Sequence, residues 1–126
     1  MKKEGIAALA LLLLLAAALW NSYTVSRMAS EIAGHVAAAA ERMEQGDIPS
    51  AERRAQAAAD AWNARSGYVR LVLRHGEIDA VTASLRELSL AVGAGDGAAA
   101  SAAAETALYR LRAMAELERV SPGSIF

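Results

Sequence analysis

The sequence predicts an all-α protein: an N-terminal transmembrane helix followed by an antiparallel four-helix bundle made of two helical hairpins. Three observations predict this fold. Alanine, the best helix former, is the commonest residue, whereas the chain has only 2 prolines and 1 phenylalanine. A charge-free stretch from Gly5 to Ser26 follows a short basic start. After that stretch, apolar residues recur every three or four positions, which is the period of a helix.

Length and charge limit the possible functions. The chain has 126 residues, which is enough for one domain. Its 13 Lys and Arg residues are balanced by 14 Asp and Glu residues, whereas dedicated nucleic-acid binders carry a strong basic excess. We therefore expect no nucleic-acid partner. The absence of cysteine excludes disulfides, a cysteine nucleophile and a thiolate zinc site.

The N-terminal stretch is too uniformly apolar for a helix of a small soluble domain. Its most apolar part, from Gly5 to Trp20, has about 16 residues, short of the roughly 20 that span a hydrocarbon core, so two interpretations compete. Cleavage after Ala18 would make it a signal peptide. Uncharged residues and the aromatic pair Trp20 and Tyr23 continue past that point, as at a membrane interface, which favours an uncleaved anchor.

The charges that flank the anchor predict its orientation. Two lysines at the N-terminus outweigh Glu4, so we expect a cytoplasmic N-terminus and an extracytoplasmic domain. This interpretation divides the chain into a membrane anchor at 1–25, which contacts the lipid bilayer through residues 5–25, and a helical domain at 26–126. The expected location is the cell membrane, with a single pass.

Beyond the anchor, the pattern predicts helices at about 25–43, 49–65, 68–92 and 98–120. The first continues from the anchor without an intervening proline, so the two are expected to form one rod. Each helix has an apolar stripe that should face the core: Val25, Met28, Ile32, Val36, Ala39 and Met43; Ala51, Ala55, Ala58 and Trp62; Leu71, Ile78, Val81, Leu85, Leu88 and Val92; and Ala104, Leu108, Leu111, Met114 and Leu117.

Two glycine–aspartate turns connect these helices. Gly46–Asp47 and Gly95–Asp96 lie about fifty residues apart, and each follows a long helix and precedes an alanine-rich one. This spacing predicts two hairpins in tandem, which resemble units of the tetratricopeptide kind with a longer period. Because there are only two units, we expect a closed bundle and not an open array. The sequence Ser121-Pro122-Gly123 is expected to end the last helix.

Short motifs, in order along nearly the whole chain, resemble a known family, domain of unknown function 4363. Its members share a single membrane helix, a His-x-Glu-Ile-Asp segment and a terminus close to Asn-Ile-Phe, where this chain has Ser124 in place of the asparagine. The resemblance implies a membrane-anchored helical protein of spore-forming Gram-positive bacteria without an assigned activity. The positions that match are Trp62, His75, Glu77, Ile78, Asp79, Ile125 and Phe126.

The segment around His75 is the one cluster of ionisable residues that suggests a site. On a helix His75 and Asp79 share a face, whereas Glu77 points elsewhere. Two ligands are half of a zinc site, so a metal would also need His35 on a neighbouring helix. We therefore predict no catalytic, cofactor-binding or metal-binding residue, and expect His75 and Asp79 to pair with each other or with arginines.

Four apolar or aromatic residues could contact a partner. Trp62 and Tyr68 flank a turn and could form a binding platform, but a tryptophan at a stripe position more often fills a core. Ile125 and Phe126 could be a tail that binds a partner. A plug against the end of the bundle is the better expectation, because an exposed apolar terminus is otherwise a liability.

The sequence contains no catalytic constellation, and this leads to our functional hypothesis. We expect a non-enzymatic interaction or scaffold module at the bacterial cell envelope, which binds another envelope protein. Two alternatives stay open. One is a metal- or ligand-sensing module that uses His75 and Asp79, and the other is a secreted soluble helical bundle after signal cleavage.

Overall fold

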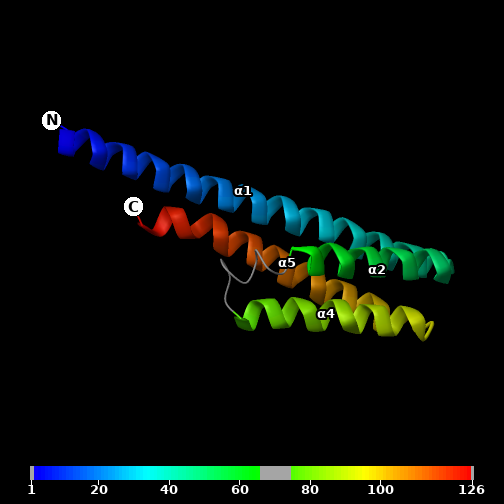
Figure 1. Ribbon diagram of the computed structural model, residues 1–126. Coiled ribbons are helices and arrows are strands. Elements are labelled where there is room, and N and C mark those ends of the chain that lie inside the picture. The colour runs from blue at the N-terminus through cyan, green and yellow to red at the C-terminus, as the bar shows by residue number, and fades with distance from the viewer. Residues whose placement is uncertain (1, 66–74, 126) are drawn as a thin grey trace.

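The computed structural model describes residues 2–65 and 75–125, with side chains in the last helix described as far as Glu116. Within these residues the chain forms four helices and no strand: α1 (Lys2–Glu44), α2 (Ile48–Ala64), α4 (His75–Gly93) and α5 (Gly97–Ile125). Figure 1 shows an elongated bundle from which the N-terminal half of α1 projects. The predicted all-α fold is confirmed.

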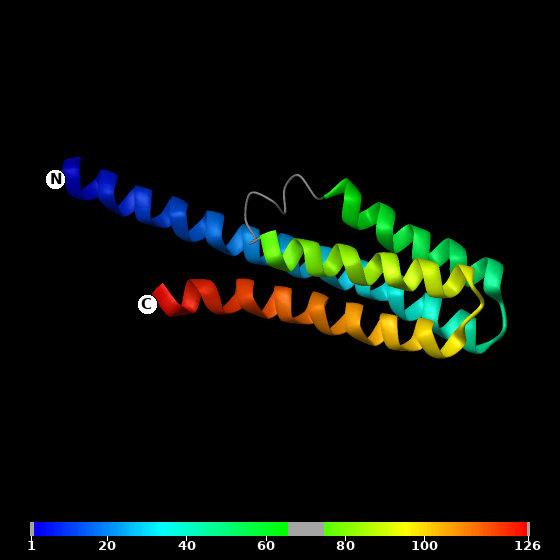
Figure 2. The same ribbon diagram turned by 90° about the horizontal axis from the view of Figure 1, so that it is seen from below.

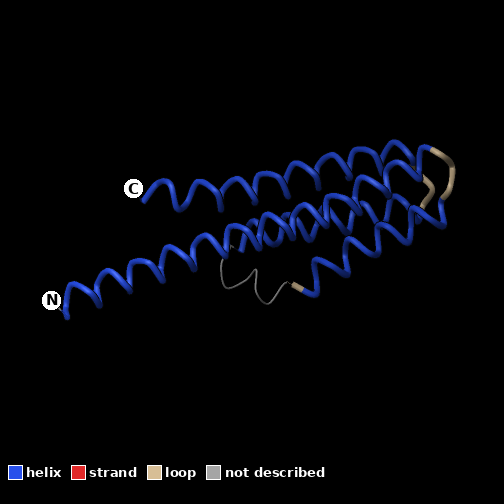
Figure 3. Tube along the Cα trace, turned by 90° about the horizontal axis from the view of Figure 1, so that it is seen from above, coloured by secondary structure: helices blue, strands red, loops and turns tan. Residues whose placement is uncertain are grey.

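The four helices are arranged in a ring. α1 and α4 each pack against both α2 and α5, so α1 and α4 occupy diagonal positions. Figures 2 and 3, seen from opposite sides, show the α1–α2 turn and the α4–α5 turn at the same end of the bundle. The two hairpins therefore lie beside each other in a closed four-helix bundle, as the sequence predicts.

The predicted stripes form the core of this bundle. Among the stripe positions whose side chains are described, Met43 and Leu108 are half-buried and all the others are buried. α2 and α5 contribute mainly alanines, which let helix axes approach closely, while α1 and α4 contribute most of the larger aliphatic side chains. Leu71 and Leu117 lie outside the described side chains.

The turn after α1 satisfies the backbone groups at both helix ends that it joins. The Asp47 N–H donates to the Arg42 carbonyl at 2.9 Å, and the Gly46 N–H donates to the Met43 carbonyl at 3.0 Å. This hydrogen-bond pair needs a left-handed residue, and Gly46 has a φ of 78°. The Asp47 carboxylate then accepts a hydrogen bond from the Ser50 N–H at 3.2 Å and so caps α2.

The turn after α4 repeats this geometry. The N–H groups of Asp96 and Gly95 donate to the carbonyls of Ala91 and Val92, both at 3.0 Å, and Gly95 has a φ of 70°. The Asp96 carboxylate accepts from the Ala99 N–H at 3.1 Å and caps α5. The two Gly–Asp pairs seen in the sequence are thus equivalent turns.

The last helix ends later than the sequence predicts. An end at Ser121–Gly123 is expected, whereas α5 runs to Ile125, so that prediction is wrong. The prediction rests on the missing N–H of Pro122, which removes a helical hydrogen bond. The proline ring also fixes φ near the helical value, and this favours continuation of the helix. The stretch 66–74, in which the third helix was expected to begin, lies outside the described residues.

Candidate functional site

The N-terminal half of α1 is an apolar surface that no other part of the bundle covers. Of the described helices, α1 alone is long and apolar enough to cross a membrane, and none of its most apolar stretch is buried. The large aliphatic side chains there are between 38% and 69% exposed. They are Ile6, Leu9, Leu11, Leu12, Leu13, Leu14, Leu15 and Leu19. An exposed apolar surface of this size is typical of a segment that contacts a membrane or another protein.

The apolar surface ends in an aromatic and basic cluster. Trp20 is 69% exposed and Tyr23 is 60% exposed, and both lie on the same side of α1 as the exposed Arg27. The Arg27 guanidinium Nη1 donates a hydrogen bond to the Tyr23 hydroxyl at 3.4 Å. Val25, on the opposite side of the helix, is fully buried in the bundle. The exposed apolar stretch and the bundle therefore meet within one or two turns of α1.

Trp62, the first family-motif position, belongs to the core. Its side chain is 1% exposed, and its indole N–H donates to the Thr82 hydroxyl at 2.9 Å. The Thr82 hydroxyl in turn donates to the Ile78 carbonyl at 2.8 Å, so Thr82 connects two motif positions, Trp62 on α2 and Ile78 on α4. The core interpretation of Trp62 is confirmed, and Tyr68 lies outside the described residues.

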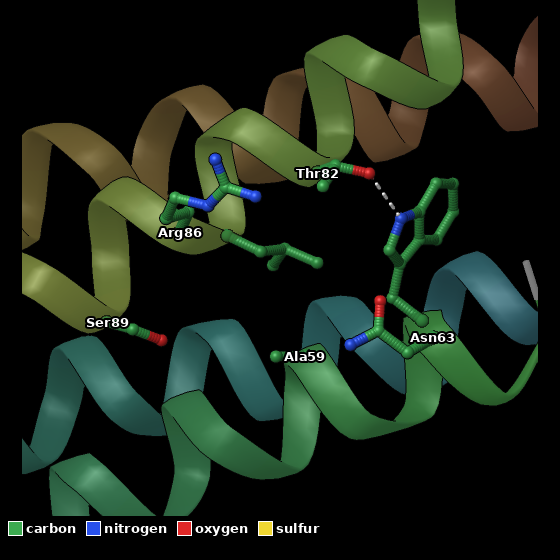
Figure 4. Close-up of a pocket in the computed structure, with 7 residues that line it drawn as sticks. Ala59, Asn63, Thr82, Arg86 and Ser89 are labelled. Atoms are coloured by element: carbon green, nitrogen blue, oxygen red, sulfur yellow. Dashed lines mark hydrogen bonds between the residues drawn. The ribbon is translucent and has the colours of Figure 1, made fainter. Parts of the chain in front are cut away.

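A groove of about 220 Å³ opens beside Trp62, between α2 and α4 (Figure 4). Among the described residues that line it, Arg86 is the only charged one, and Thr82 and Ser89 supply hydroxyls. None of these lining residues is acidic, so they form no acid–base pair. The full lining is Ala59, Trp62, Asn63, Thr82, Leu85, Arg86 and Ser89.

The His75–Asp79 segment forms the first turn of α4, and the structure separates its residues. Ile78 is buried at 4% exposure, Glu77 is half-buried and Asp79 is exposed. Glu77 lines a groove of about 90 Å³ with Tyr109 on α5. The side chains of His75, Ile125 and Phe126 lie outside those described, so their predicted pairing and plug stay predictions.

The predicted metal alternative depends on helix order. A shared site for His35, His75 and Asp79 would need the first and third predicted helices to be neighbours. These helices are α1 and α4, which lie diagonally across the bundle. Among the side chains that are described, no three His, Asp or Glu residues gather in a position to hold a metal ion.

An ion pair connects the anchor helix to α2. Arg65 Nη2 lies 3.3 Å from the Glu31 carboxylate, and the two side chains are 42% and 48% exposed. This pair uses the acidic residue that lies one turn beyond Arg27 on α1. Neither this pair nor the Trp62–Thr82 hydrogen bond is predictable from the sequence pattern, because both join residues on different helices. The position of Thr82, one turn after Ile78, was the one sequence feature that could have indicated its hydrogen bond to the Ile78 carbonyl.

Comparison with known proteins identifies a family for most of the chain. A family model described as "Domain of unknown function (DUF4363)" matches residues 19–125, from the end of the apolar stretch through the whole bundle. No curated protein and no solved structure matches the chain. The resemblance found in the sequence motifs is confirmed, and the match carries no assigned activity.

Proposed function

We propose that this chain, which belongs to the DUF4363 family of domains of unknown function, is a membrane-anchored, non-enzymatic interaction module of the bacterial cell envelope. One observation carries the proposal. α1 is a single helix whose N-terminal half exposes aliphatic side chains on every side, and whose C-terminal half contributes a buried stripe to a closed bundle. Such a helix fixes a folded domain directly to a lipid bilayer.

The charges support a cytoplasmic N-terminus and an extracytoplasmic bundle. Lys2 and Lys3 precede the apolar stretch, and positively charged flanks are retained on the cytoplasmic side. The continuity of α1 supports an uncleaved anchor. Ala18 lies inside a helix that is unbroken from Lys2 to Glu44, whereas proteases cut extended, accessible segments.

The bundle surface supports a protein partner and no chemistry. None of the described residues that line the groove beside Trp62 is acidic, and the groove at Glu77 has a volume of about 90 Å³. Among the described large apolar side chains outside the anchor, Leu90 at 68% and Tyr109 at 70% are the most exposed. They lie on α4 and α5, and we propose that the partner contacts these two helices.

Anchoring and orientation are tested in bacterial membranes with the full-length chain. Because the chain has no cysteine, Ser101→Cys and Lys3→Cys each introduce one thiol. We expect the protein to stay in the membrane after alkaline carbonate washing, and a membrane-impermeant maleimide to label Ser101→Cys but not Lys3→Cys on intact cells. A soluble product whose intact mass begins at Leu19 would establish the secreted alternative.

Partner binding is tested by placing a photo-crosslinking amino acid at Leu90, Tyr109 or, as a control, the exposed Arg53 on α2. We expect the same crosslinked protein from the first two positions and none from the third. Equal crosslinking from all three positions would contradict a specific face. Stoichiometric uptake of zinc by the wild-type chain, lost in His75→Ala, would instead favour the sensing alternative.

A further inference from the structure

The side of α1 that carries Trp20, Tyr23 and Arg27 is the side that the bundle leaves open. These residues are three and four positions apart, so they form one stripe along the helix. The bundle packs on the opposite stripe, where Val25 and Met28 are 0% and 1% exposed. The surroundings of α1 between residues 20 and 27 therefore contact the Trp20–Tyr23–Arg27 stripe and not the buried stripe.

No spacer separates the apolar stretch from the bundle. The charge-free stretch continues to Ser26, whereas bundle packing already begins at Val25. If the stretch lies in lipid, the point at which α1 enters the bundle must lie at the membrane surface, and the last part of α5, which continues beyond that level beside α1, must reach the headgroup layer too (Figure 1). Because α1 has no break there, the bundle also cannot fold away from the direction of the anchor.

The spacing of the stripe matches the headgroup layer. Seven residues separate Trp20 from Arg27, which is roughly 10 Å along a helix at about 1.5 Å per residue. The polar layer on each side of a bilayer is about 5 to 8 Å thick, so Trp20 at the edge of the hydrocarbon places the Arg27 backbone just outside this layer, and the long arginine side chain reaches back into it. Tryptophan and tyrosine prefer this level, where one end of the ring is apolar and the other is wet.

Arg27 has the chemistry to bind a phosphate there. A guanidinium donates in parallel to two phosphate oxygens, which a lysine cannot do. The nearest carboxylate one turn along α1 is Glu31, which pairs with Arg65 at 3.3 Å. Arg27 itself donates to the uncharged Tyr23 hydroxyl at a long 3.4 Å, so no carboxylate neutralises its charge within the stripe.

We propose that Arg27, held beside Tyr23, binds the phosphate of membrane phospholipids and seats the base of the bundle on the headgroup layer. This inference rests on the proposed anchor. It also fixes what faces away from the membrane, because the turns at Gly46 and Gly95 lie at the opposite end of the bundle. The α4–α5 face would then stand upright above the membrane.

Phosphate binding is tested with full-length protein, labelled with carbon-13 at its arginines, in vesicles of phosphatidylethanolamine and phosphatidylglycerol. Solid-state NMR measures the dephasing of guanidinium carbon signals by lipid phosphorus. We expect Arg27→Gln to remove one arginine from the dephased signal. The matched control Arg54→Gln, an equal charge change at an exposed α2 position, should leave the dephasing unchanged. Dephasing that is the same in Arg27→Gln and wild type would overturn the proposal.

The seated bundle is tested by spin labels at Ser30→Cys and Ser101→Cys, both exposed positions. Ser30 lies one turn beyond Arg27, whereas Ser101 lies close to the turns. We expect a water-soluble nickel complex to relax the Ser101 label several-fold more than the Ser30 label, which headgroups shield. Equal relaxation would show a bundle that stands clear of the membrane. Loss of the protein in carbonate would instead remove the anchor itself, so the two failures are distinguishable.

Discussion

The two halves of α1 are both apolar, and they differ in how their apolar residues are distributed. In the N-terminal half leucines point in all directions, and Leu11, Leu12 and Leu13, three successive positions, are each about three-fifths exposed. In the C-terminal half, buried residues such as Ile32 and Val36 recur at helical spacing, and exposed or polar residues separate them. One continuous helix therefore has an apolar surface exposed on every side and a buried stripe. The two halves differ in the pattern of their apolar residues, not in the amount of apolar surface.

The helices that cover the buried half of α1 present mainly small residues to the core. α2 and α5 present Ala51, Ala55 and Ala58, and Ala100, Ala104 and Ala107, to the core. Alanine lets the backbones approach, and α1 and α4 then fill the narrow space with larger side chains. In the exposed half, no described helix buries the large aliphatic side chains, which suits the proposed contact with lipid.

The largest expected effect comes from placing a carboxylate in each half. Val36→Asp buries a charge at a position with 0% exposure, which should cost roughly 4 kcal/mol or more and unfold the bundle, while the protein stays in the membrane. Leu13→Asp puts the charge near the middle of the apolar stretch, at a cost of about 3 kcal/mol for insertion, while the bundle stays folded. Carbonate extraction measures whether each variant stays in the membrane, and near-ultraviolet circular dichroism in detergent measures whether its bundle is folded.

These two variants test whether the two halves of α1 act independently. Val36→Ala and Leu13→Ala are the controls, because they remove apolar volume without adding charge. If Leu13→Asp unfolded the bundle, or if Val36→Asp released the protein from the membrane, the two halves would not be independent surfaces of one helix.

A smaller effect is expected from two leucines on α4, which repeat the comparison within the bundle. Leu85 is 3% exposed and Leu90 is 68% exposed. Leu85→Ala should lower the free energy of unfolding by roughly 2 to 5 kcal/mol, and Leu90→Ala by less than about 0.5 kcal/mol. Thermal unfolding followed by Trp62 fluorescence, in a Trp20→Phe background, measures both. An unchanged melting temperature in Leu85→Ala would show that the α4 stripe is wrongly assigned.

Local patterns were sufficient for most of the fold. The stripe of α4 follows from its spacing, and the turns follow from Gly46 and Gly95, because each depends on residues that are close in sequence. The ring order, with α1 and α4 on the diagonal, depends on packing between distant segments and was not predictable in this way. The Trp62–Thr82 hydrogen bond was missed for the same reason, since twenty positions separate the two residues.

The end of α5 shows a different difficulty. Pro122 combines two opposing preferences, a missing hydrogen-bond donor and a helical φ, and the sequence alone does not weigh them. The candidate site divides similarly. The aromatic belt of Trp20 and Tyr23 was readable from its position after the apolar stretch. The pairing of Glu31 with Arg65, which lie on different helices, required the three-dimensional arrangement.

The smallest expected effect concerns the turn at which the buried half of α1 ends. Gly46 and Gly95 have left-handed φ values of 78° and 70°. An added Cβ would meet nothing within 4 Å at Gly46, and at Gly95 only the Ile48 Cδ1 at 3.6 Å, which is an ordinary contact. Steric clash is therefore absent at both sites, and the cost of alanine comes from the backbone conformation, about 1 to 2 kcal/mol each.

Because the two turns are equivalent, Gly46→Ala and Gly95→Ala should lower the free energy of unfolding by similar amounts, measured by urea unfolding of the full chain in detergent. Gly46→Asn and Gly95→Asn are the matched controls, since asparagine tolerates a left-handed conformation and should cost less than alanine. A much larger loss of unfolding free energy in Gly46→Ala than in Gly95→Ala would mean that the two turns are not equivalent. The anchor helix would then stabilise the bundle in a way that the α4–α5 hairpin does not, and the buried half of α1 could not be treated as an ordinary bundle helix.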